Sequence, residues 1–121
     1  MDKQQAIHSF WSRYATAYEE TSVPDDADLS NGYITYQKIL GSIDEPVFMT
    51  ASVWTRSSSW LEADTIVNKI NEDLSHGGII IPIEGGRMWI ERGNPFAQAM
   101  SDTDRTIRRY VINIAVEFFT E

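Results

Sequence analysis

Apolar residues recur along the chain with two different spacings, and these spacings predict its helices and strands. Over residues 6–18 they fall at helical spacing and form one broad stripe, with Asp2 as a candidate N-cap. A second stripe of this kind covers residues 60–74, after serines 57–59 that can cap it and before a glycine stop at 77–78. The pattern therefore predicts two amphipathic helices, each burying one side.

The other apolar segments predict β-strands. They are rich in β-branched and aromatic residues or alternate between apolar and polar side chains. The predicted strands cover residues 33–40, 47–56, 79–83, 87–92 and 105–120. A loop at 23–32 precedes the first of these strands, and turn signals at 41–46 and 85–86 separate strands that follow one another. Residues 93–104 carry no regular pattern, although Phe96 and Met100 could anchor a short helical piece there.

The strand predicted at 105–120 has the clearest alternation in the chain. Five apolar side chains take every second position, from Tyr110 to Phe118. Such a strand has one buried face and one wetter face. The expected order of elements is α-β-β-α-β-β-β. We therefore expect a single domain over residues 1–121, of class α+β, with a mainly antiparallel sheet of about four to five strands and two helices packed on one face.

Charge narrows the choice of partners. The 121 residues hold 18 acidic and 10 basic side chains, a net charge of −8. Residues 1–60 carry 8 acids and 4 bases and residues 61–121 carry 10 and 6, so each part has a charge of −4. Proteins that wrap duplex nucleic acid usually present a clustered positive surface. We therefore expect no sequence-specific nucleic-acid binding, although an acidic wall past which DNA slides remains compatible with this charge.

The apolar runs are short and cysteine is missing from the sequence. The longest run, residues 77–83, falls far below the ~18 residues of a membrane span and is interrupted by Pro82. The first residues lack the apolar segment of a secretory signal, so synthesis in the cytoplasm is the default expectation. Zero cysteines exclude disulfides, thiol catalysis and cysteine-type zinc sites from this sequence.

Several polar groups are candidates for a catalytic, metal-binding or phosphate-binding site. His8 and His76 have no second histidine or carboxylate at ligand spacing, so a helix-flank and a helix-end role are favoured over a metal or base role. The acids of residues 25–28 lack the glycine and distant glutamate of an EF-hand loop. Serines 57–59 lie outside a nucleophile elbow, and the glycine pairs at 77–78 and 85–86 lack phosphate-loop neighbours. We therefore expect no catalytic residue, no metal and no cofactor.

Basic residues gather near the start of the last predicted strand. Arg105, Arg108 and Arg109 lie close in sequence, and Arg87 and Arg92 fall on a strand that can neighbour them. Phosphate contact or a salt bridge between subunits is one interpretation. Charge balance in an acidic protein is the other, and the residues alone favour it.

Three stretches of the sequence together resemble one protein family. They are VPDDADLSNGYITYQKI (residues 23–39), FMTASVWTRSSSWLEADTIVNKINEDL (48–74) and DTDRTIRRYVINIAVEFF (102–119). The second has a strand ending in Val-Trp-Thr-Arg, a serine-rich turn and a helix with regularly spaced apolar residues. This combination is similar to the tail completion or tail terminator proteins of long-tailed bacteriophages and prophages. The helix predicted at the N-terminus fits the same family.

The resemblance implies a structural virion component. Such a protein forms a homo-oligomeric ring, usually a hexamer, which caps the tail tube, ends its polymerisation and joins the tail to the head connector. Its partners would be copies of itself, the major tail tube protein and the connector, with no membrane involved. It would lie in the host cytoplasm during assembly and in the virion tail afterwards.

Ring contacts join two different patches of neighbouring copies, so an interface is expected. The candidate subunit-interface residues lie in and around the irregular segment: Arg92, Phe96, Met100, Arg105 and Arg108. Phe96 and Met100 are included because a mobile loop has little other reason to carry large apolar side chains. Two alternatives stay open: a head–tail adaptor or other minor tail component, and a small enzyme or ligand-binding domain.

Overall fold

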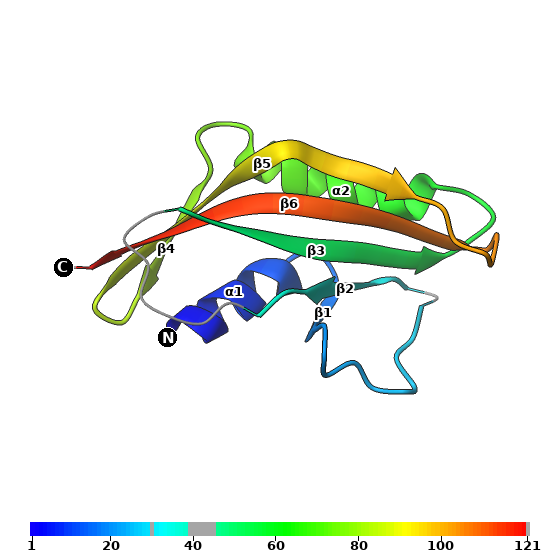
Figure 1. Ribbon diagram of the computed structural model, residues 1–121, viewed down its shortest axis with the longest axis horizontal. Helices are drawn as coiled ribbons and strands as arrows, with labels where there is room; N and C mark the ends of the chain where they lie inside the picture. The colour runs from blue at the N-terminus through cyan, green and yellow to red at the C-terminus, as the bar shows by residue number, and fades with distance from the viewer. Residues whose placement is uncertain (30, 39–45, 121) are drawn as a thin grey trace.

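The computed structural model describes residues 1–29, 31–38 and 46–120, which form two helices and one six-stranded sheet (Figure 1). The elements are α1 (Lys3–Ser12), β1 (Thr16–Glu19), β2 (Tyr33–Tyr36), β3 (Val47–Arg56), α2 (Leu61–Leu74), β4 (Ile79–Ile83), β5 (Gly86–Met100) and β6 (Ile107–Thr120). The strand order is β1-β2-β3-β6-β5-β4. All neighbours are antiparallel except β1 and β2. The predicted α+β class and mainly antiparallel sheet are therefore confirmed.

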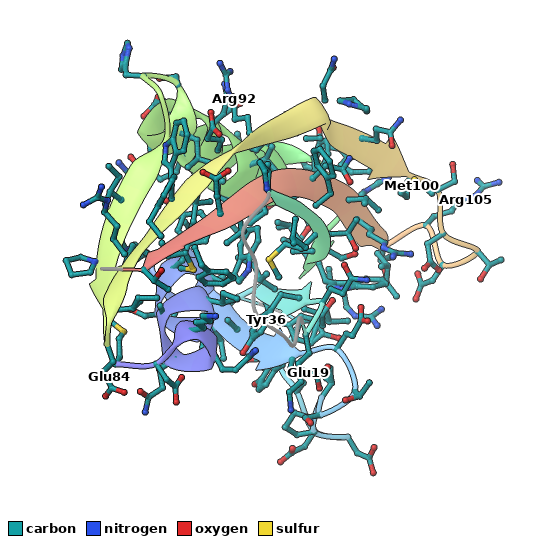
Figure 2. All side chains as sticks on the ribbon, turned by 60° about the vertical axis from the view of Figure 1, so that its left-hand side comes forward. Glu19, Tyr36, Glu84, Arg92, Met100 and Arg105 are labelled. Carbon is teal, nitrogen blue, oxygen red and sulfur yellow. The ribbon has the colours of Figure 1, made fainter. Side chains whose placement is uncertain are left out.

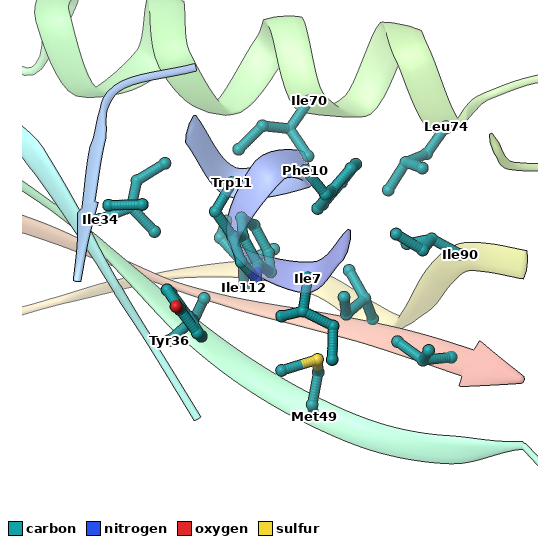
Figure 3. Packing of buried hydrophobic residues seen from close by; sticks show 14 of the residues in the cluster. Ile7, Phe10, Trp11, Ile34, Tyr36, Met49, Ile70, Leu74, Ile90 and Ile112 are labelled. Atoms are coloured by element: carbon teal, nitrogen blue, oxygen red, sulfur yellow. The ribbon is translucent and has the colours of Figure 1, made fainter. Parts of the chain in front are cut away.

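Both helices pack on the same face of the sheet. Side chains at alternate positions of β3 and β6 point to this face, so Met49 lies opposite Ile114 and Val53 opposite Tyr110. They join the buried side of α1 and the buried side of α2 in one apolar cluster. Figure 3 shows Phe10 and Trp11 of α1 between α2 and the strands. The opposite face of the sheet has no helix on it, and this face is called the open face below.

The sheet curls around α1, which touches strands at both sheet edges. It contacts β1 and β4, the first and last strands of the order. The backbone N–H of Glu84 after β4 donates to the carbonyl of Met1 over 2.9 Å. At the start of the helix, the Asp2 carboxylate accepts from the backbone of Gln5, and the Gln5 side chain accepts from the backbone of Asp2. The predicted N-cap is thus confirmed and fixes where α1 begins.

The first helix is shorter than predicted. The apolar spacing extends to Tyr18, but α1 ends at Ser12 and residues 16–19 form β1. The backbone of Tyr14 donates to the carbonyl of Trp11 in a tight final turn, and the chain then pairs in parallel with β2. Ala17 is buried against the sheet. A buried apolar residue at this position is consistent with the strand that forms as well as with the helix that was predicted. This strand explains why the sheet has six strands and the prediction of four to five was wrong.

The segment predicted to be irregular is a strand instead. β5 continues through residues 93–100, so a short helical piece there is excluded. Its pairing with β6 shifts between Arg92 and Ala97, which places the extra residues in a β-bulge that contains the cis Asn94–Pro95 peptide bond. The bulge leaves the pairing of Ala97–Met100 with β6 intact. A turn-like sequence is therefore accommodated inside a continuous strand.

The remaining boundaries differ by a few residues. β2 ends at Tyr36 and β6 begins at Ile107, so Arg105 lies in the turn before β6. Part of the predicted turn at 41–46 and the end of the predicted strand at 33–40 fall outside the described residues. The serines before α2 assist its start, because the Leu61 N–H donates to the Ser59 hydroxyl, although the N-cap position itself is Trp60.

Candidate functional site

Three of the five predicted interface residues meet at the tip of the β5–β6 hairpin. A shallow pocket of about 290 Å³ lies there, lined by Met100, Arg105 and Arg108 together with Trp60, Ser101, Asp102, Asp104 and Ile107. Figure 2 shows Met100 and Arg105 close together at this end of the molecule. The structure therefore brings these three candidates to one place, which we call the tip pocket.

The other two predicted residues lie elsewhere. Phe96 packs against the buried core from β5, so its presence is explained by core packing and the mobile-loop argument for it was wrong. Arg92 donates to the side-chain oxygen of Asn71 on α2 over 3.0 Å. It borders a second, smaller pocket of about 170 Å³ beside the end of α2. Neither residue contributes to the tip pocket.

Arg108 holds the tip pocket together. Its guanidinium donates to the carbonyls of Ser57 and Ser58 over 3.2 and 3.0 Å. The same group lies 5.3 Å from the centre of the Trp60 ring, within cation–π range. Trp60 in turn meets Tyr110 edge-on at 5.3 Å. These contacts fix the serine turn and the start of α2 against the first residues of β6, so the pocket wall is preformed.

Tyr110 links the same region to α2. Its hydroxyl donates to the Asp64 carboxylate, and this hydrogen bond is the main reason why the pKa of Tyr110 is raised. The aromatic pair and this bond together join β6 to the first turn of α2. The tip pocket is therefore supported by contacts on both sides of Trp60.

Asp104 is the anchor of the turn between β5 and β6. Its carboxylate accepts from the Thr106 hydroxyl and backbone N–H over 2.7 and 2.9 Å. It also pairs with Arg56 at the end of β3 over 3.0 Å. The bonds from Thr106 first, and then the one from Arg56, lower the pKa of Asp104 from 3.8 to about 2.

We predict that the hairpin turn loosens in acid. Because the folded pKa of Asp104 is depressed, its contribution is present above pH 3.8 and is lost as the pH falls through about 2. The Thr106 amide signal, followed by NMR during an acid titration, should report a midpoint near 2. In an Asp104→Asn control this transition should vanish. A Thr106 midpoint near 3.8 would contradict the bonded geometry of the turn.

The open face carries three exposed apolar side chains, of which the sequence analysis selected Met100 but not Phe48 or Ile80. The exposed fractions are 75% for Phe48, 61% for Ile80 and 41% for Met100. Strand alternation places all three on this face, because Met49, Ile81 and Ala99 beside them point the other way. A signal was present in the sequence: Phe48 stands on the side of its alternating strand that also carries the polar residues Thr50 and Ser52.

The open face also holds arginines stacked on aromatic rings. Arg109 lies 4.5 Å from the Trp54 ring centre and donates to the Ser52 hydroxyl over 3.1 Å. Arg87 lies 5.6 Å from the Phe119 ring centre. The arginine cluster of the sequence is thus divided, since Arg108 faces the tip pocket and Arg109 the open face.

The other candidate groups have structural surroundings. His8 Nδ1 lies 3.0 Å from the Tyr36 hydroxyl on the flank of α1, and His76 is exposed after α2. Gly77, Gly78 and Gly85 have positive φ, as turn glycines do. Within residues 1–29, 31–38 and 46–120, no three histidine or acidic side chains gather as a metal site would require.

The described helices include none long and apolar enough to cross a membrane. Comparison of the chain with protein-family models and with curated protein sequences finds no match, so the family resemblance rests on the residue patterns alone.

Proposed function

We propose that this chain is a structural virion protein that assembles into a homo-oligomeric ring, caps the tail tube of a long-tailed phage or prophage, and joins it to the head connector. The observation that carries the proposal is the open face. This face leaves the apolar side chains of Phe48, Ile80 and Met100 exposed, with no helix of the described residues over them (Figure 1). These side chains are suited to contacts with neighbouring protein subunits.

The hairpin tip supports an assembly role of the same kind. Tryptophan, methionine and arginine are the residue types enriched in protein interfaces, and Trp60, Met100 and Arg105 all line the tip pocket. At about 290 Å³, the pocket lies at the lower bound of the ~300–1,000 Å³ of common small-molecule sites. The proposal uses it as a contact between proteins and gives the chain no catalytic step.

Net charge suits a protein that surrounds passing DNA. Each subunit contributes a charge of −8, which a ring multiplies by its number of copies. An acidic lumen repels phosphates and lets DNA pass without adhering. In this proposal the ring forms in the host cytoplasm, remains in the virion tail, and binds no nucleic-acid sequence specifically.

The ring is tested by measuring mass in solution. Light scattering of the purified chain, alone and mixed with the tail tube protein of the same virus, should show several 13.8-kDa subunits, or a hexamer bound to tube ends. Electron microscopy should then show tubes whose growth stops where the protein binds. A chain that stays monomeric and never binds tubes would overturn the proposal, while binding to the connector but not to tubes would favour a head–tail adaptor.

Matched surface variants test whether the open face makes these contacts. We predict that Phe48→Ser combined with Ile80→Ser weakens oligomerisation or tube binding by at least about tenfold, because each removes an apolar side chain from the contact. Asn68→Ser, a neutral change at an exposed position on α2, should leave the mass distribution unchanged. Equal behaviour of the two proteins would mean that the open face is not an assembly surface.

A further inference from the structure

The arginines around the tip pocket are not equally engaged. Arg56 binds Asp104, and Arg108 binds the serine carbonyls and Trp60. Arg105 is exposed and makes no hydrogen bond, ion pair or ring contact within the described part of the chain. Its guanidinium therefore stands free beside a preformed wall, in a protein that has an excess of acids. Such a group is available to a carboxylate from outside.

The pocket is less acidic than the chain as a whole. Its lining holds two arginines, Arg105 and Arg108, and two acids, Asp102 and Asp104, and Arg56 beside it pairs with one of these acids. Asp104 is neutralised by Arg56, and Asp102 accepts the backbone N–H of Asp104 over 2.9 Å. Met100 and Ile107 add apolar surface. The pocket is thus complementary to a segment that carries both carboxylates and apolar groups.

The chain itself contains a segment with these properties. Residues 14–37 include five acids and no basic residue. Within them, a turn closes where the Ala27 N–H donates to the Pro24 carbonyl over 3.1 Å, which places Asp25 and Asp26 at the turn's centre. Both carboxylates are exposed and make no hydrogen bond or ion pair within the described residues. Apolar Pro24 adjoins them.

Within one chain, Arg105 does not pair with Asp25 or Asp26. We propose that the turn at Pro24–Ala27 of one copy docks at the tip pocket of another copy, with Asp25 and Asp26 pairing to Arg105 and Pro24 lying against Trp60 and Met100. This inference rests on the proposed assembly and identifies one contact within it. Because the two surfaces differ, the contact is heterologous, which is the kind that closes rings.

The absence of cysteine from the sequence makes a direct test possible. A Ser101→Cys protein and an Ala27→Cys protein with different tags, which both keep Arg105, Asp25 and Asp26, are mixed, oxidised and separated by mass. A disulfide requires Cα atoms within about 7 Å, so it reports close approach of the two surfaces. We expect the mixed disulfide dimer to form at least about tenfold faster than in a mixture where Glu84→Cys replaces Ser101→Cys. Figure 2 shows Glu84 and Arg105 at opposite ends of the molecule.

The outcomes separate this contact from the proposed function. Oligomers that form without a faster Ser101→Cys to Ala27→Cys disulfide would overturn the contact and leave the ring intact. A chain that remains monomeric, alone and with the tail tube protein, and gives only background disulfide would overturn both. Because Ser101, Ala27 and Glu84 lie outside the buried core, circular dichroism should show unchanged folding in every cysteine variant.

Charge reversal gives a second measurement that does not depend on cysteine. Arg105→Glu, or Asp25→Arg with Asp26→Arg, should each weaken assembly by at least about tenfold, because like charges then face each other across the contact. The protein carrying all three substitutions should recover assembly, since opposite charges meet again. Losses that simply add in the combined variant would contradict direct pairing.

Discussion

Replacing Trp11 with alanine is expected to lower the free energy of unfolding by about 3–5 kcal/mol. Trp11 is completely buried and is the largest of the fully buried side chains. It meets Phe10 edge-on at 4.8 Å and lies in the space that the sheet, α1 and α2 enclose (Figure 3). The loss is a large part of the ~5–15 kcal/mol that stabilises a typical domain. Urea unfolding followed by circular dichroism measures it.

Two further variants separate cavity formation from other effects. Trp11→Phe should cost only about 1–2 kcal/mol, because it keeps a ring and removes an indole N–H that is buried without a partner in the described residues. Phe48→Ala removes an exposed ring and should change stability by less than about 0.5 kcal/mol. If Trp11→Ala unfolds no more readily than Phe48→Ala, the core does not centre on α1.

The sequence predicted best those elements whose burial pattern is long. β3 and β6 pair over ten positions with their buried residues in register. A one-residue slip of either strand would move all of its apolar side chains to the open face, so alternation excludes that register. α2 repeats its apolar positions over four turns and was predicted to within one residue. A long periodic segment is compatible with only one type of secondary structure, so its prediction is more accurate.

The errors fall where pairing depends on distant residues. Thr16–Glu19 is too short to distinguish a strand from a helix end, and its partner β2 lies beyond a loop. In β5, Asn94 and Pro95 suggest a turn, and only the neighbouring β6 shows that a bulge absorbs them. Local propensity is overridden in both places by pairing that the local pattern does not contain.

The candidate site was predictable in part for a similar reason. Arg105, Arg108 and Met100 lie near one hairpin turn, so sequence proximity already suggested that they meet. Trp60 joins them only because Arg108 ties the serine turn to β6, a contact across some fifty residues of sequence. Phe96 was misread because its loop became a strand. The sequence could not predict that Arg105 and Asp26 lack partners within the described residues, because this depends on which side chains the fold brings near them.

Replacing Gly86 with alanine is expected to lower the free energy of unfolding by about 3 kcal/mol, the second large effect among these predictions. Gly86 begins β5 opposite Thr120. A Cβ atom at this position would lie 1.8 Å from the carbonyl oxygen of Phe119, which belongs to the backbone and cannot rotate away. The hairpin of β4 and β5 must therefore shift away from the end of β6. Urea unfolding gives the loss, and faster hydrogen exchange at Phe119 and Thr120 locates it.

The neighbouring glycine provides the matched control. Gly85 has a φ of +78°, but a Cβ there meets nothing within 4 Å. Gly85→Ala should therefore lower the free energy of unfolding by only about 1–2 kcal/mol, the cost of a left-handed backbone at alanine. It should leave hydrogen exchange at the end of β6 unchanged. The difference between the two variants isolates the cost of the steric clash, because the side chain added is the same. Equal losses with unchanged exchange at Thr120 would show that β5 and β6 do not approach this closely at Gly86.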